Sequence, residues 1–436
     1  MKFYDRKSEL ALLKKIEKTA QEHAQMTFMV GRRRIGKTSL LIKAFEESTH
    51  LYFFVAKKNE SLLCAEFVEE IKKQLNIPVF GEIKTFKVLF NWLMELSKNH
   101  DFTLIIDEFQ EFNWINSSIF SEMQNIWDGN KDESKMNLIL CGSIYSMMSK
   151  IFENVKEPLF GRATHRIHLK AFDVETLKEI LTDYSPSYSN DDLLAFYLFT
   201  GGVAKYVELL VQKRAFTLPL ILDEIVAENS LFLEEGKNVL IEEFGKDYGN
   251  YFSILTLIAS GKTSRAEIES ILEIQTGGFL SKLENEYGLL KKVRPVLSKP
   301  NSRSVKYTIE DNFLKFWFRF IYKNRSAVEV SNYDYIKEII NRDYRTYSGK
   351  ILEKYFIEQF KATKNYNVIG TYWEKKNQNE IDIVAINELK KTVLIAEVKR
   401  NAKKISLEKL KVKSTKLALQ LQNYKITYKE LSLKDM

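Results

Sequence analysis

The sequence contains few residues that could cross-link the chain or bind a transition metal. Only two cysteines, Cys64 and Cys141, occur in 436 residues, and they lie far apart, each beside apolar residues. Neither a disulfide framework nor a cysteine zinc site is supported, and a reducing compartment is expected. The five histidines show no metal-ligand spacing, and serine and threonine show no nucleophile–base pair.

Long apolar runs, internal repeats and low-complexity linkers are also missing, and only six prolines occur. No apolar stretch approaches the roughly 18 residues that a membrane-spanning helix needs. We therefore expect a soluble, cytoplasmic protein with no membrane partner. Lys plus Arg number 66 against 58 Asp plus Glu, a net charge of +8 that permits an acidic partner without identifying one.

The length suggests roughly two to four domains, and the chain divides into four parts. Residues 1–175 alternate short apolar runs with helical periodicity, which predicts an α/β domain with a parallel sheet flanked by helices. Residues 176–246 are helical throughout and form a candidate lid. Residues 247–335 predict three short helices, a β-hairpin and a connector, the pattern of a winged helix-turn-helix. Residues 336–436 mix strands and helices again, as a small α/β domain.

The stretch "GRRRIGKTSL", which begins at Gly31, matches the phosphate-binding pattern G-x-x-x-x-G-K-[ST]. Gly31 lets the chain turn off the preceding strand, and Gly36 lets backbone N–H groups approach phosphate oxygens. Lys37 would reach the β and γ phosphates, and Thr38 would offer its hydroxyl to Mg²⁺. The predicted nucleotide-binding residues are Gly31, Arg32, Arg33, Arg34, Ile35, Gly36, Lys37, Thr38 and Ser39.

The three arginines occupy variable positions of this loop. Arg32, Arg33 and Arg34 would add positive potential near a triphosphate or reach a partner surface. Solvated loop arginines are an equally good interpretation.

Two acids follow the apolar run "FTLIID". Asp107 would hold Mg²⁺ through water, and Glu108 would act as general base on the attacking water. The alternative is an ordinary acidic exit from a strand. Ser143, which ends the next apolar run, is the candidate sensor of the γ phosphate. Arg162, after Gly161, is a candidate arginine finger in cis or from a neighbouring subunit, with a structural salt bridge as the competing account.

These stretches, with "FYDRKSELALL", "GSIYSMM", "PLFGRA" and "TGGVAKYVELL", resemble the archaeal-type AAA ATPase family, within the signalling P-loop NTPases. The resemblance covers nearly the whole chain. It implies ATP as ligand, Mg²⁺ as metal, and a nucleotide-gated rearrangement of lid and winged helix. One departure is the absence of a proline near Ala204. Lys205 could substitute there as a cation on the phosphate side.

The last block carries a second cluster of charged residues. A four-residue turn at Glu388 to Lys391 would place Asp382 opposite Glu397, with Lys399 on the same face as Glu397. Such a cluster can hold Mg²⁺ while the lysine orients water or stabilises a pentavalent phosphate.

The spacing resembles the PD-(D/E)XK restriction-endonuclease-like fold, in which a preceding helix adds an acid. Glu353 fits that position, so the predicted metal ligands are Glu353, Asp382 and Glu397. A cross-strand ion pair on a solvated hairpin is the alternative. A third possibility is a fold retained for binding, with weak or no cleavage.

Residues 390–436 carry thirteen Lys plus Arg against four acids, which favours contact with a phosphate backbone over base stacking. A solvated lysine-rich helix is the alternative. In the expected winged helix, the third helix sets Glu284 and Glu286 against Lys282, so an acidic face would repel phosphate. Its wing is basic, so backbone contact through the wing stays open, as does an intramolecular regulatory role.

The leading hypothesis is a Mg²⁺-dependent ATPase that couples its nucleotide state to a nuclease-like domain contacting nucleic acid. The first alternative is a nucleotide-controlled switch whose last domain only binds a partner. The second is a DNA-binding regulator built on the winged helix. A homo-oligomer is possible in each case.

Overall fold

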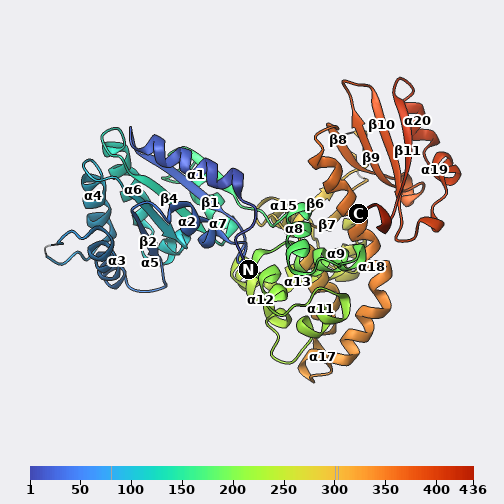
Figure 1. Ribbon diagram of the computed structural model, residues 1–436, viewed down its shortest axis with the longest axis horizontal. Coiled ribbons are helices and arrows are strands. Elements are labelled where there is room, and N and C mark those ends of the chain that lie inside the picture. The colour runs from blue at the N-terminus through green and yellow to red at the C-terminus, as the bar shows by residue number, and fades with distance from the viewer. Residues whose placement is uncertain (80, 300, 303) are drawn as a thin grey trace. The chain divides into compact units, whose positions relative to one another are not determined.

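The computed structural model describes residues 1–79, 81–299, 301–302 and 304–436, and its chain forms two compact units (Figure 1). The first is Phe3–Ala171 together with Val203–Lys205. The second is Phe172–Gly202 and Tyr206–Met436, together with Met1–Lys2.

The first unit alternates strands with helices. Its elements are α1 (Lys7–Ala20), β1 (Gln25–Val30), α2 (Lys37–Phe45), β2 (His50–Phe54), α3 (Glu60–Leu75), α4 (Phe86–Leu96), β3 (Thr103–Asp107), α5 (Phe112–Ile115), α6 (Ser118–Asn130), β4 (Asn137–Gly142), α7 (Tyr145–Glu153) and β5 (His165–His168).

These strands form one parallel sheet in the order β2-β3-β4-β1-β5. Every residue of β1, β3 and β4 is buried, as expected of strands covered by helices on both faces. One face packs against apolar side chains of α3, α4 and α6 in a single core. The predicted α/β fold with a parallel sheet is confirmed. Because the strands are parallel, the residues that follow β1, β3 and β4 emerge at one edge of the sheet.

The second unit is helical before it becomes mixed. The elements after β5 are α8 (Val174–Tyr184), α9 (Asn190–Thr200), α10 (Ala204–Gln212), α11 (Leu218–Ile225), α12 (Leu231–Phe244), α13 (Tyr248–Ala259), α14 (Arg265–Leu272), α15 (Gly277–Asn285), β6 (Leu290–Val293), β7 (Lys306–Ile309), α16 (Asn312–Phe316), α17 (Arg325–Glu329), α18 (Tyr333–Ala362), β8 (Val368–Tyr372), β9 (Ile381–Asn387), β10 (Thr392–Val398), α19 (Leu407–Lys413), α20 (Thr415–Gln420) and β11 (Lys425–Leu431).

Helices α13 to α15 are followed by the antiparallel hairpin β6–β7, which is the order of elements expected from the sequence. The loop of this hairpin is docked on the last sheet. The Val296 amide donates to the Thr371 carbonyl at 2.9 Å, and the Val296 side chain belongs to the apolar core of that sheet. Trp373 Nε1 donates to Ser304 Oγ at 2.8 Å. The hairpin therefore supports the C-terminal sheet from within the chain.

The C-terminal sheet has the order β11-β10-β9-β8, with β10 antiparallel to β9 and parallel to β11. Figure 1 shows α19 and α20 beside this sheet, and Leu410 and Leu417 of these helices, with Leu421 directly after α20, close its apolar core. The β9–β10 register pairs Thr392 with Asn387 through a turn of four residues, as expected from the sequence. The register reaches Ala396 opposite Ile383, and continuing it by one residue sets Asp382 across from Glu397.

Among the described helices, none combines the length and apolar character that crossing a bilayer requires.

Candidate active site

The phosphate-binding loop lies between β1 and α2 and has the backbone that its glycines allow. Gly36 has a φ of 95°, a conformation that favours glycine. At Gly31 a Cβ atom would lie only 2.9 Å from the Leu169 carbonyl oxygen. Arg6, 4% exposed, donates to the carbonyls of Lys170 at 2.7 Å and Ile35 at 3.4 Å, so a residue before α1 braces the loop.

Lys37 is the first residue of α2, and its side chain is folded over the loop. Its Nζ donates to the Gly31 carbonyl at 2.7 Å and to the Arg32 carbonyl at 3.3 Å. Burial lowers the pKa of this amine, while Glu108 and Asp107 oppose the shift. A cation that has lost much of its water is suited to pair with phosphate oxygens, because no ordered hydration shell has to be removed.

Asp107 lies at the end of β3, next to Thr38. The Thr38 hydroxyl donates to Asp107 Oδ2 at 3.2 Å, and the Glu108 amide donates to Asp107 Oδ1 at 2.9 Å. A hydroxyl oxygen beside a carboxylate is the oxygen donor set that Mg²⁺ prefers. These two residues therefore fit the metal predicted for this place.

Glu108 and Ser143 are brought together from β3 and the end of β4. The Ser143 hydroxyl donates to Glu108 Oε2 at 2.8 Å, and Arg33 Nε donates to Ser143 Oγ at 3.4 Å. Glu108 has a left-handed φ of 54°, so the backbone leaves the extended strand conformation at this residue. Gln110 Nε2 holds the same carboxylate at 2.6 Å. The predicted base and the predicted sensor thus touch each other.

For three of the predicted nucleotide-binding residues, the structure shows their place in the loop or on α2. Arg34 accepts the Lys205 amide on its carbonyl at 3.1 Å, Ile35 is buried in the loop, and Ser39 is exposed on α2. Their roles, like that of Arg32, stay predictions.

Arg162 forms the structural contact that the sequence left as an alternative. Its guanidinium pairs with Asp128 of α6 at 3.0 Å and also donates to the Phe160 carbonyl. This ion pair occupies the arginine within its own unit, and its role as an arginine finger stays a prediction.

Two residues to which the sequence analysis gave no role at this site also contact Asp107. The Tyr52 hydroxyl, from β2, donates to Asp107 Oδ2, and the Cys141 thiol, from β4, lies 3.2 Å from Asp107 Oδ1. Burial and the nearby Asp107 carboxylate raise the pKa values of both groups, so both stay protonated donors. No local signal marks Tyr52, because only the sheet order places β2 beside β3.

The second predicted cluster also assembles, at one end of the β9–β10 hairpin. Lys399 Nζ lies 3.1 Å from Asp382 Oδ2 and 3.1 Å from Glu397 Oε1. Lys413 of α19 contacts both Glu397 oxygens, at 3.1 and 3.2 Å. Burial tends to lower the pKa of Lys399, but the two carboxylates outweigh it and the pKa is raised. The Asp382 and Glu397 carboxylates are therefore paired with the ammonium groups of Lys399 and Lys413, which close the cluster.

The carboxyl group of Glu353, on α18, is influenced by the charges of this cluster. Its side chain is 13% exposed and pairs with Lys350 at 3.0 Å. Burial, and then the charge of Asp382, raise its pKa to about 7. Over the residues that the structure describes, no group of three or more His, Cys, Asp or Glu side chains is arranged to hold a metal ion. Metal binding by Glu353, Asp382 and Glu397 stays a prediction.

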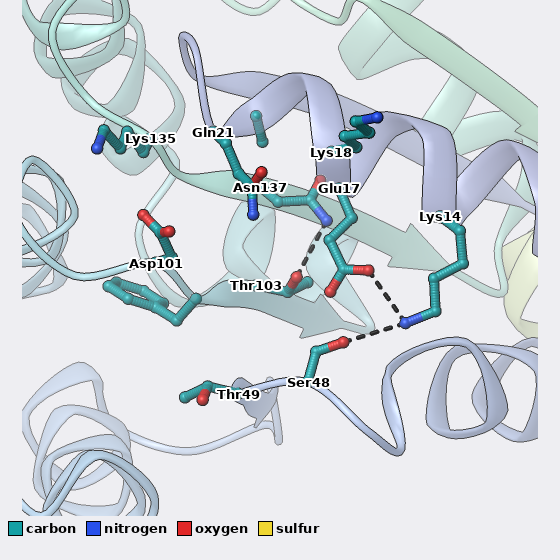
Figure 2. Close-up of a pocket in the computed structure, with 12 residues that line it drawn as sticks. Lys14, Glu17, Lys18, Gln21, Ser48, Thr49, Asp101, Thr103, Lys135 and Asn137 are labelled. Atoms are coloured by element: carbon teal, nitrogen blue, oxygen red, sulfur yellow. Dashed lines mark hydrogen bonds and ion pairs between the residues drawn. The ribbon is translucent and has the colours of Figure 1, made fainter.

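A polar hollow of about 450 Å³ opens at the opposite edge of the first sheet (Figure 2). It lies at the amino ends of β2, β3 and β4, where Lys14 bridges Glu17 and Ser48 at 3.1 Å each. Because the phosphate-binding loop follows the carboxyl end of β1, this hollow is separate from the nucleotide site.

Comparisons with known proteins agree with this geometry. A family model described as an ATPase domain predominantly from Archaea matches residues 3–210. A second model, described as archaeal and bacterial proteins of unknown function, matches residues 317–413. An uncharacterized protein of Methanocaldococcus jannaschii is 30% identical over 420 residues, which cover 92% of this chain and 90% of the relative.

Two solved structures share the fold. The Walker-type ATPase of Pyrococcus abyssi superposes with a TM-score of 0.56 at 18% identity, over 72% of this chain and 96% of that one. The ORC2 protein of Aeropyrum pernix, in complexes with ADPNP and ADP, superposes with a TM-score of 0.51 at 15% identity, over 78% of this chain and 95% of that one.

Proposed function

Because the chain belongs to the archaeal ATPase family whose model and full-length relative it matches, we propose that its ATP-binding state controls a C-terminal domain that contacts nucleic acid. The resemblance to archaeal P-loop ATPases read from the sequence is confirmed, and the chain is an ATPase. The residue roles, the coupling and the partner are the proposal.

In the proposed reaction, Lys37 leaves the loop carbonyls and pairs with β and γ phosphate oxygens. Glu108 accepts the proton of the attacking water as its oxygen bonds to the γ phosphorus and the bond to the β–γ bridging oxygen breaks. Ser143 links Glu108 to Arg33, so the base and a loop arginine respond together to the γ phosphate. Thr38 and Asp107 would hold Mg²⁺, which would neutralise charge on the phosphates.

The observation that carries the coupling is helix α9. Its first turn is clasped to the C-terminal domain: Arg400 Nη2 pairs with Asp191 Oδ2 at 2.7 Å, and Tyr344 donates to Asp191 Oδ1 at 3.0 Å. Arg400 directly follows Lys399, and its other nitrogen, Nη1, donates to Ser348 Oγ at 2.6 Å. The clasp therefore reaches the residue next to the charged cluster.

The other end of α9 leads toward the phosphate-binding loop. The helix ends at Thr200, and Gly201 and Gly202 follow with φ values of 58° and 74°. The next three residues, Val203–Lys205, belong to the ATPase unit, where the Lys205 amide donates to the Arg34 carbonyl at 3.1 Å. Helix α9 thus connects the Val203–Lys205 segment, which contacts the phosphate-binding loop, to the Asp191–Arg400 clasp. This connection supports the proposal that the nucleotide state affects the C-terminal domain.

Contact with a nucleic acid backbone is supported by the basic composition of residues 390–436, most of whose lysines are exposed. In one version of this function the domain cleaves the nucleic acid, by analogy with the nuclease-like spacing of Asp382, Glu397 and Lys399. The second form, a binding module without cleavage, is favoured by the ammonium groups that close the cluster. Docking of the β6–β7 loop on the last sheet speaks for an intramolecular role of that hairpin, against the winged-helix regulator.

The test uses the full chain with phosphate release, fluorescent ATP binding and DNA binding measured side by side. Lys37→Ala should lose ATP binding, whereas Glu108→Gln should keep ATP binding and lose at least a hundredfold in hydrolysis rate. DNA affinity should change with ATP in the wild type and not in Lys37→Ala. An ATP-independent DNA affinity in an active ATPase would refute the coupling.

Cleavage is tested separately on supercoiled plasmid in Mg²⁺ or Mn²⁺, with Asp382→Ala as the comparison. Nicking that is lost in Asp382→Ala would identify a nuclease. DNA binding with no nicking by the wild type would identify the binding module.

A further inference from the structure

The carboxylate of Asp107 is surrounded by donors from four parts of the first unit. Oδ2 receives the hydroxyls of Thr38 and Tyr52, and Oδ1 receives the Glu108 amide at 2.9 Å and lies 3.2 Å from the Cys141 thiol. Donors therefore approach both carboxylate oxygens, and the orientation of Asp107 is set from α2, β2, the residue after β3, and β4.

We infer that Tyr52 is a positioning residue for the Mg²⁺ site: its hydroxyl fixes Asp107 so that its Oδ2 oxygen faces the Thr38 hydroxyl. The inference rests on the proposed function, in which Thr38 and Asp107 hold the metal. Tyr52 is assigned no contact with the nucleotide or the metal, and acts through Asp107.

Tyr52 is the strongest of the side-chain donors that could set this orientation without binding the metal. A phenol is a better hydrogen-bond donor than the thiol of Cys141, which donates weakly. Tyr52 also shares the Oδ2 oxygen with Thr38, so it acts on the oxygen that faces the loop. Its place is set by β2, where Tyr52 pairs in register with Ile105 of β3, two residues before Asp107.

Without the hydroxyl, Asp107 can rotate about its side-chain bonds and one lone pair of Oδ2 is no longer held. Loss of a group that orients a metal ligand typically costs about 10- to 100-fold in metal affinity or activity. For Tyr52→Phe we expect the Mg²⁺ concentration that half-saturates nucleotide binding to rise roughly tenfold. Nucleotide affinity in EDTA should stay the same, because Lys37 and the loop are untouched.

The experiment titrates a fluorescent ADP analogue into the full chain, in EDTA and at increasing Mg²⁺. Binding of Mn²⁺ to the nucleotide complex, followed by electron paramagnetic resonance, gives a readout that does not depend on turnover. Tyr428→Phe is the matched control, since it removes a hydroxyl that lies 3.0 Å from Ser414 Oγ in the C-terminal domain. A merely structural role of Tyr52 would lower affinity in EDTA as well.

The outcomes separate the inference from the proposed function. If Mg²⁺ does not strengthen nucleotide binding by the wild type, the metal site itself fails. If it does, and Tyr52→Phe responds to Mg²⁺ and Mn²⁺ like the wild type and Tyr428→Phe, the positioning role is overturned. A rise in half-saturation confined to Tyr52→Phe, with the EDTA affinity unchanged, supports it.

Discussion

Replacing Lys399 by methionine tests whether the charged cluster of the C-terminal domain is held together by its ammonium group. Lys399 contacts Asp382 and Glu397 at 3.1 Å each, and at an effective dielectric constant of about 20 each contact has a gross attraction of about 5 kcal/mol. Desolvation offsets most of this attraction, and the side chain is 38% exposed, so solvent screens the remainder.

After the substitution, Glu397 keeps Lys413, whereas Asp382 keeps the Val398 amide at 2.8 Å as its hydrogen-bond donor among the described residues. One buried carboxylate is left without its cation, so we expect a loss of about 2 kcal/mol in the free energy of unfolding at pH 7.

Urea unfolding followed by circular dichroism at pH 7 measures this loss. Lys429→Met, at an exposed lysine of the neighbouring strand β11, is the control. A loss below about 0.5 kcal/mol would refute the reasoning, since exposed ion pairs contribute that little. Stability restored to Lys399→Met by Mg²⁺ would indicate that the carboxylates accept a divalent cation once the ammonium is gone.

Three further predictions concern other parts of the chain. The pKa of Glu353 is raised from an ordinary 4.5 to about 7. Its contribution to the free energy of unfolding is therefore greatest below pH 4.5 and is lost as pH rises through 7. Glu353→Gln should flatten the pH dependence of the urea midpoint between pH 5 and 8. A double-mutant cycle with Asp191→Ala and Arg400→Ala should give a coupling energy of about 1 kcal/mol in urea unfolding, and additive single effects would contradict the clasp. Asp191→Asn should weaken the effect of ATP on DNA binding without changing the rate of ATP hydrolysis. Gly36→Ala places a side chain at a φ of 95° and should cost about 1–2 kcal/mol and most ATP affinity, with Gly278→Ala, where a Cβ meets open space, as the control.

The nucleotide loop and the fold of the first unit could be predicted because their signals are local. The pattern from Gly31 to Thr38 occupies eight consecutive residues, and the glycines, the lysine and the helix start dictate its geometry together. Short buried runs that alternate with amphipathic helices specify a parallel sheet. The β9–β10 register followed from a four-residue turn for the same reason.

The partners of the predicted site residues depend on the tertiary structure, because a short stretch of sequence does not specify the order of strands in the sheet or the direction of side chains. The order β2-β3-β4 brings Tyr52 and Cys141 to Asp107, although they are 55 and 34 residues away in sequence. Folding also pairs Arg162 with Asp128 and sets Lys413 on Glu397. In each case the partner comes from an element whose position is fixed by packing of the whole core.

The sequence by itself thus determined the chemistry of a nucleotide-binding loop and the presence of a second charged cluster, since residue type and spacing are enough to specify both. Only the tertiary structure decided what holds Asp107, that ammonium groups close the C-terminal cluster, and that α9 is clasped through Asp191 and Arg400. Most of these contacts join residues 16 to 209 positions apart, and their geometry exists only once the strands and helices have packed.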